Sequence, residues 1–119
     1  MVPAAARHHA LVMTASERIT AEVTAWPGVT AGPGRRGEFA FKVGKREIGH
    51  LHGDHAAHFS FPRDVWDELR AEGRITYHPV FPDKPGPAAR RIATEHDVRD
   101  VIALMRLNYD AVQRKAEVA

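Results

Sequence analysis

The sequence predicts an α+β protein whose mainly antiparallel sheet, a β-meander plus one or two further strands, is covered by three helices. Apolar residues recur at helical spacing in three separate segments, whereas residues 39–61 alternate at period two between tight turns. No strand–helix–strand unit repeats, as a parallel sheet would require. A chain of 119 residues is long enough to bury one core. We therefore expect a loose N-terminal tail over residues 1–13 and a single α+β domain over residues 14–119.

The first helix is predicted to begin after Thr14, because Thr14 and Glu17 have the spacing of a capping box. Ile19 and Val23 lie one turn apart and give the helix an apolar face. Pro27 ends it, since the residue before a proline avoids the helical conformation.

A meander should follow this helix. Gly32, Pro33 and Gly34 predict a turn, after which residues 39–43 alternate as a half-buried strand does. Two tight turns containing glycine then lead into strands at residues 46–52 and 55–61.

The second helix is predicted to start at Pro62, which is suited to a first helical position, and to end before Gly73. Residues 75–81 predict a strand. Pro79 cannot donate a hydrogen bond to a neighbouring strand, so this segment should lie at an edge or a bulge.

Residues 89–93 predict a short last strand, and Thr94 caps the final helix. That helix carries the longest helical-period pattern of the chain and must pack on the sheet. Its apolar positions are Val98, Val101, Ile102, Met105, Tyr109 and Val112.

The composition excludes several classes of protein. There is no cysteine, which rules out disulfide scaffolds, thiol nucleophiles, iron–sulfur sites and cysteine-bound zinc, and fits a reducing cytoplasm. No apolar run approaches the ~20 residues of a membrane helix, and the N-terminal residues do not have the pattern of a signal peptide. We therefore expect a cytoplasmic protein without a membrane partner.

Histidines are the candidate functional residues. His50 and His52 lie two residues apart in a predicted strand, so both project from one face at a spacing of about 7 Å. A third imidazole would come from His55, His58 or His78, and the predicted metal set is His50, His52 and His55, with a divalent metal as cofactor. Asp54 and Glu47 are the nearby carboxylates, but strict alternation places Glu47 on the opposite face to His50.

Basic residues gather around the first predicted hairpin. Arg35, Arg36, Lys45 and Arg46 form a candidate site for nucleic acid or another anion, although the formal net charge is only +2.

Several ordered motifs resemble a small bacterial and fungal family named for a luciferase domain. They are Gly-His-Leu-His-Gly at residues 49–53, Phe-Pro-Arg at residues 61–63, and Leu-Met-Arg-Leu-Asn-Tyr at residues 104–109. The similarity spans residues 37–109 and departs from the family at His58, where relatives carry an acidic residue, and at residues 84–86, where Lys-Pro-Gly replaces Ser-Gly-Trp. The resemblance implies no particular reaction. It marks a site at His50, His52 and His78, with Asp54 and Arg63 as neighbours.

Three functions follow from these observations. The first is binding of a small molecule or a protein partner on the sheet face that carries the histidines. The second is metal binding or metal-dependent catalysis through the histidines, and the third is nucleic-acid or anion binding through the basic hairpin.

Overall fold

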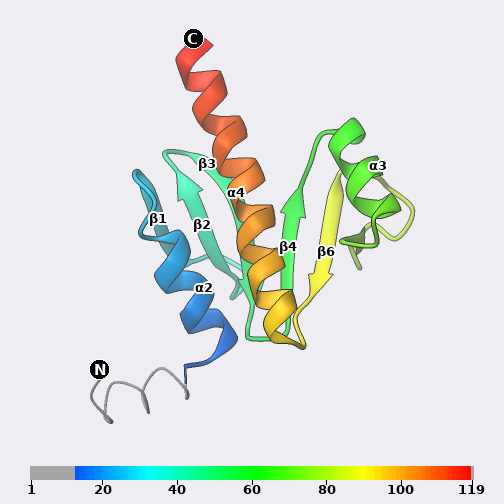
Figure 1. Cartoon of the computed structure of the whole chain (residues 1–119), viewed down its shortest axis with the longest axis horizontal. Coiled ribbons are helices and arrows are strands. Elements are labelled where there is room, and N and C mark those ends of the chain that lie inside the picture. Colours follow the sequence, from blue (N-terminus) through cyan, green and yellow to red (C-terminus); the bar gives the residue numbers. More distant parts are fainter. Residues whose placement is uncertain (1–12, 119) are drawn as a thin grey trace.

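The computed structural model describes residues 13–118, so the predicted tail lies almost wholly outside the described residues. Six strands form one antiparallel sheet in the order β1-β2-β3-β4-β6-β5. Helices α2 (Ala15–Val23) and α4 (Glu95–Val118) lie across one face of this sheet, and α3 (Arg63–Ala71) lies at its β6 side (Figure 1). The predicted α+β class with a mainly antiparallel sheet is confirmed.

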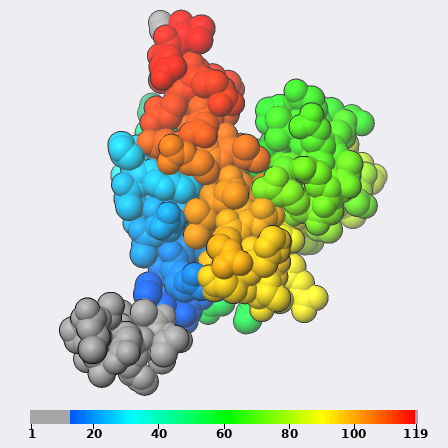
Figure 2. All heavy atoms as spheres, viewed as in Figure 1, coloured from blue at the N-terminus to red at the C-terminus, as the bar shows by residue number. Residues whose placement is uncertain are grey.

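The first helix has the predicted capping box. The Thr14 hydroxyl accepts a hydrogen bond from the Glu17 amide at 3.1 Å, and the Glu17 carboxylate accepts one from the Thr14 amide at 3.0 Å. The buried side chains of Ile19 and Val23 face the sheet and α4. In the space-filling view the atoms of α4 lie between those of α2 and α3 (Figure 2).

The predicted turn at residues 32–34 is wrong in part. Gly32 and Pro33 end strand β1 (Val29–Pro33), and the turn follows at residues 34–38. Strand β1 pairs only with β2 (Phe39–Val43) and is an edge of the sheet, where a proline at the end of a strand costs no hydrogen bond.

The meander itself is confirmed. Strand β2 pairs with β3 (Arg46–His52), and β3 pairs with β4 (Ala56–Ser60). The register of β2 and β3 shifts between Phe41 and Lys42, because Phe41 pairs with Gly49 and Lys42 with Glu47. Ile48 is therefore the extra residue of a β-bulge.

The segment after α3 differs from its prediction. Helix α3 begins one residue after Pro62, and Gly73 takes the expected left-handed conformation at φ 74°. The strand predicted at residues 75–81 is only β5 (Thr76–Tyr77), since Pro79 and Val80 form a turn that returns the chain from His78 to Phe81. Strand β6 (Pro87–Arg91) begins two residues earlier than predicted.

The core lies between the inner face of the sheet and the helices. Phe41, Ile48 and Leu51 of the sheet and Leu104 and Met105 of α4 are at most 1% exposed. No helix within residues 13–118 is long and apolar enough to cross a membrane.

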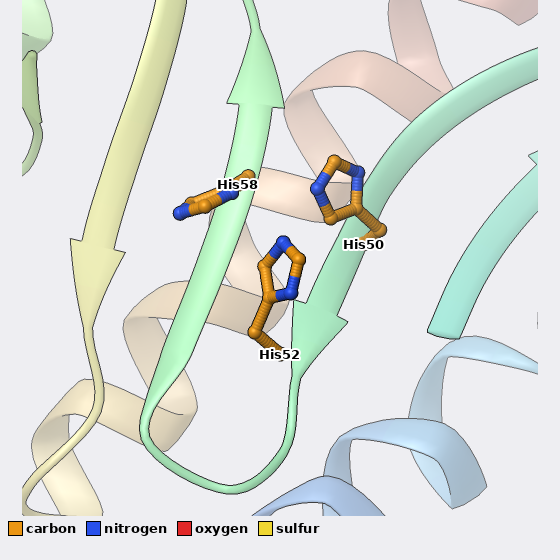
Figure 3. A group of neighbouring side chains, drawn as sticks. All are labelled: His50, His52 and His58. Atoms are coloured by element: carbon orange, nitrogen blue, oxygen red, sulfur yellow. The ribbon is translucent and has the colours of Figure 1, made fainter. Parts of the chain in front are cut away.

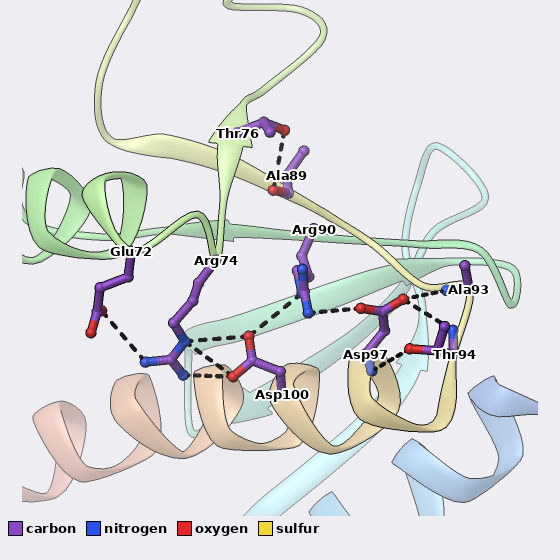
Figure 4. A network of polar contacts seen from close by, with 9 residues as sticks. All are labelled: Glu72, Arg74, Thr76, Ala89, Arg90, Ala93, Thr94, Asp97 and Asp100. Carbon is purple, nitrogen blue, oxygen red and sulfur yellow. Dashed lines mark hydrogen bonds and ion pairs between the residues drawn. The ribbon is translucent and has the colours of Figure 1, made fainter.

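An ion-pair network joins β6 and the segment that follows α3 to the first turns of α4 (Figure 4). Arg90 donates to Asp97 at 2.8 Å, and Arg74 donates to Asp100 at 2.7 Å. The Asp97 carboxylate also accepts the backbone amides of Ala93 and Thr94 and so caps α4. These bonds hold the pKa of Asp97 below its usual value.

Candidate functional site

Three histidines project together from the outer face of the sheet. His50 and His52 come from β3 and His58 from β4, and their side chains stand on the side turned away from α4 (Figure 3). His50 and His58 are direct cross-strand partners in the register. His52 lies two residues further along β3, on the same face. We call these three residues the histidine cluster.

The distances within the histidine cluster are short. One ring nitrogen of each residue lies within 4.8 Å of one ring nitrogen of each of the others. The ring centroids are 5.0 Å apart for His50 and His52, 5.3 Å for His50 and His58, and 4.5 Å for His52 and His58. The three imidazoles are therefore close enough to reach one ion after small side-chain rotations.

Small neighbours give these rings room above the sheet. The cross-strand partner of His50 on β2 is Ala40, and that of His52 on β4 is Ala56. His58 pairs with Ala89 on β6. Because each alanine ends at Cβ, these three cross-strand positions place no bulky side chain beside the imidazoles.

Glu47 belongs to the same face, which corrects the prediction that it lies opposite to His50. Its carboxylate is 2.9 Å from Nδ1 of His50. The bulge at Ile48 shifts the alternation by one residue, so Glu47 and His50 share the outer face although three positions separate them. A carboxylate that accepts Nδ1–H leaves Nε2 of His50 unprotonated and able to accept a ligand bond.

His58 is the most enclosed member of the histidine cluster. Burial first, and then the neighbouring imidazoles of His78, His52 and His50, lower the pKa of His58 to about 4. At neutral pH the ring is therefore uncharged, as a metal ligand must be. Its Nδ1 atom is buried and has no hydrogen-bond partner among residues 13–118. An unpaired buried nitrogen beside two other imidazoles fits a ligand atom.

His78 lies next to the histidine cluster but plays a different part. Its ring centroid is 4.2 Å from that of His58. Its Nδ1 accepts a hydrogen bond from the Val80 amide at 3.1 Å, so the neutral ring carries its proton on Nε2. Burial first, then His50 and His52, lower the pKa of His78. His78 is thus placed as a hydrogen-bond donor beside the cluster.

The other predicted site residues lie elsewhere. His55 is exposed in the turn between β3 and β4 and is not part of the group that could hold a metal, in which His58 stands instead. Asp54 accepts the Ser16 amide at 2.9 Å and so ties this turn to the start of α2, which lowers its pKa. Arg63 is exposed on α3 and pairs with Asp67 on the same helix.

The four predicted anion-binding residues fall into two groups. Arg35 and Arg36 are in the turn before β2, and they line a hollow on the outer face together with His50. Lys45 and Arg46 are at the opposite end of β2, where they line a separate hollow with residues near the end of α4. The strand between them keeps the two pairs apart.

The family of the chain follows from a model of the luciferase domain, which matches residues 45–108, just over half of the chain. The chain belongs to the luciferase domain family. The luciferase domain match contains all three residues of the histidine cluster, together with Glu47 and His78, whereas Arg35 and Arg36 lie before it. No curated protein and no solved structure matches the chain.

Proposed function

We propose that this luciferase domain protein binds one divalent transition-metal ion through His50, His52 and His58, and through that ion a small ligand. The observation that carries the proposal is the approach of three ring nitrogens, one from each histidine, to within 4.8 Å of one another. Imidazole is the commonest metal ligand among protein side chains and suits zinc, copper, iron and nickel.

The geometry needs little adjustment to hold an ion. Zinc–nitrogen bonds of ~2.0–2.1 Å place tetrahedral ligand nitrogens about 3.3 Å apart. The rings must therefore close by about 1.5 Å at most, which χ rotation supplies. The surroundings also fit, since Glu47 orients His50, and His58, which is neutral at pH 7, need not be deprotonated before one of its nitrogens binds a metal.

Three histidines leave part of the coordination sphere open. The outer face carries neither α2 nor α4, so a water molecule or a ligand atom can take the remaining position. Sites with three protein ligands and one exchangeable position are typical of metals that bind or activate a small molecule, whereas structural zinc sites are closed by four protein ligands. This supports the binding of a small molecule on the histidine face.

The first test is the metal content of tag-free protein purified without chelator, measured by elemental mass spectrometry. We expect about one equivalent of a transition metal in the wild type, and its loss in His58→Ala. His55→Ala is the matched control, because His55 is an exposed histidine in the adjoining turn that lies outside the histidine cluster. It should retain the full equivalent.

A thermal test gives a second readout. Free metal at a hundred times the dissociation constant stabilises a folded protein by about 2.7 kcal/mol, which corresponds to a rise in Tm of roughly 10 °C or more for a domain of this size. We expect this rise in the wild type and in His55→Ala, but not in His58→Ala. Equal behaviour of the two variants, or no uptake of manganese, iron, cobalt, nickel, copper or zinc by the wild type, would overturn the proposal.

A further inference from the structure

A hollow of about 760 Å³ adjoins the histidine cluster on the outer face of the sheet. Its wall is formed by the turn before β2, by the outer side chains of β2 and by the start of β3, and His50 and Glu47 belong to it. This volume is within the range of small-molecule sites. Because His50 borders both the hollow and the histidine cluster, a ligand held in the hollow would reach a metal bound at the cluster.

Cations dominate this hollow. Arg35, Arg36 and Lys42 line it, and none of the three forms an ion pair with any residue in the described range 13–118. Six other arginines of the structure do pair with carboxylates, namely Arg18, Arg63, Arg74, Arg90, Arg99 and Arg106. Three cations without an ion pair in that range therefore lie together in the hollow beside the histidine cluster.

The two carboxylates of the hollow do not cancel this charge. The Glu47 carboxylate is hydrogen-bonded to Nδ1 of His50. The Glu38 side chain lies directly against Gly34, where it fills the space that a Cβ atom on that residue would occupy. The hollow therefore has a net positive charge, because three positive side chains line it against two negative ones. One of the two negative side chains, Glu47, already has a histidine partner.

We propose that this hollow binds the oxyanion of the small ligand, a phosphate or a carboxylate group, while the metal at the histidine cluster binds another atom of the same molecule. This inference rests on the proposed function. Guanidinium groups match both oxyanions, since their planar fork donates two parallel hydrogen bonds. Arg35 and Arg36 provide such forks, and Lys42 adds a point charge from the neighbouring strand.

A small anion fits the arrangement better than a nucleic acid does. A bound nucleic-acid strand requires a continuous row of cations that follows its phosphates. Lys45 and Arg46 line a different hollow at the far end of β2, so they do not extend the row formed by Arg35 and Arg36.

The test uses the full-length protein loaded with cobalt(II), whose visible absorption reports its ligands, after excess cobalt has been removed by gel filtration. Inorganic phosphate, phenyl phosphate and benzoate are titrated separately at fixed ionic strength. We expect a saturable change in the cobalt spectrum with at least one of the two oxyanion types, and the comparison shows whether phosphate or carboxylate is preferred.

Two double variants locate the site. Arg35→Ala/Arg36→Ala should retain one equivalent of cobalt but bind the oxyanion at least tenfold more weakly. Lys45→Ala/Arg46→Ala removes the same charge from the other end of β2 and should bind like the wild type. Affinity should also fall as salt rises, since the anion competes with chloride for the guanidinium groups.

The outcomes separate the two proposals. If the wild type takes up no cobalt, the proposed function fails and this inference fails with it. If cobalt binds but no oxyanion alters its spectrum, or if the two double variants lose affinity equally, only the inference is overturned. Tight binding of mixed-sequence oligonucleotides that both double variants weaken would also overturn it, in favour of a nucleic-acid surface.

Discussion

Glu47 provides the sharpest test of how the histidine cluster is oriented. In Glu47→Gln the acceptor oxygen remains but the negative charge beside His50 is lost, whereas Glu47→Ala removes both. Partners of this kind change metal affinity by roughly 10–100-fold. The side chains of His50 and Glu47 are 20% and 41% exposed, so solvent weakens the effect of the charge. We therefore expect a loss of about tenfold in Glu47→Gln, or about 1.4 kcal/mol, and a larger loss in Glu47→Ala.

The assay is competition for zinc against a chromophoric chelator at pH 7.5. Glu38→Gln is the matched control, because it removes the same charge from the same hollow without a contact to His50. It should change the affinity for zinc less than twofold. Unaltered affinity in Glu47→Gln, or an equal loss in the control, would refute the role assigned to the Glu47 carboxylate.

Three further predictions concern packing, the ion-pair network and pH. Gly49→Ala should lower the free energy of unfolding by about 1–3 kcal/mol in urea denaturation, because its Cβ would lie 2.7 Å from Sδ of Met105; no change would contradict this close packing. Arg90→Met should cost about 2–3 kcal/mol in the same assay, since it leaves the 16%-exposed Asp97 carboxylate without its guanidinium partner; a loss below 0.5 kcal/mol would show the pair to be unimportant. In metal-free protein an NMR titration should find the pKa of His58 at about 4. Because the unfolded state binds this proton at a pH of about 6.5 and the folded state does not, stability should fall from pH 6.5 toward 4, and a normal pKa would argue against the burial of this ring.

The elements that local signals specify were predictable. The capping box at Thr14 predicted where α2 begins, and the alternation of residues 39–43 predicted strand β2. Strand β1 was missed because it ends in Gly32 and Pro33, which are poor strand residues. These two residues are held in the sheet by their pairing with β2. The length of β5 was overestimated because the pattern of apolar residues does not reveal the turn at Pro79.

The histidine site was predictable in part. Period-two spacing was sufficient to place His50 and His52 together, and it allowed only one of His55 and His58 to join them. The choice between these two depends on where β4 begins, since the turn includes His55 and the strand starts one residue later. The proximity of His78 to His58 could not be predicted from local sequence, because it depends on the pairing of β6 with both β4 and β5. It also depends on Ala89, a small residue of β6 that lies between His58 and strand β5.

The bulge at Ile48 explains why Glu47 could not be placed by alternation. Ile48 and Leu51 are both buried in the core although they are three residues apart, and a regular strand would place them on opposite faces. A bulge lets both be buried, but it frees the Ile48 carbonyl from regular pairing. Asn108 of α4 donates to that carbonyl at 3.1 Å. Packing of α4 on the inner face therefore stabilises the irregularity that brings Glu47 and His50 together on the outer face.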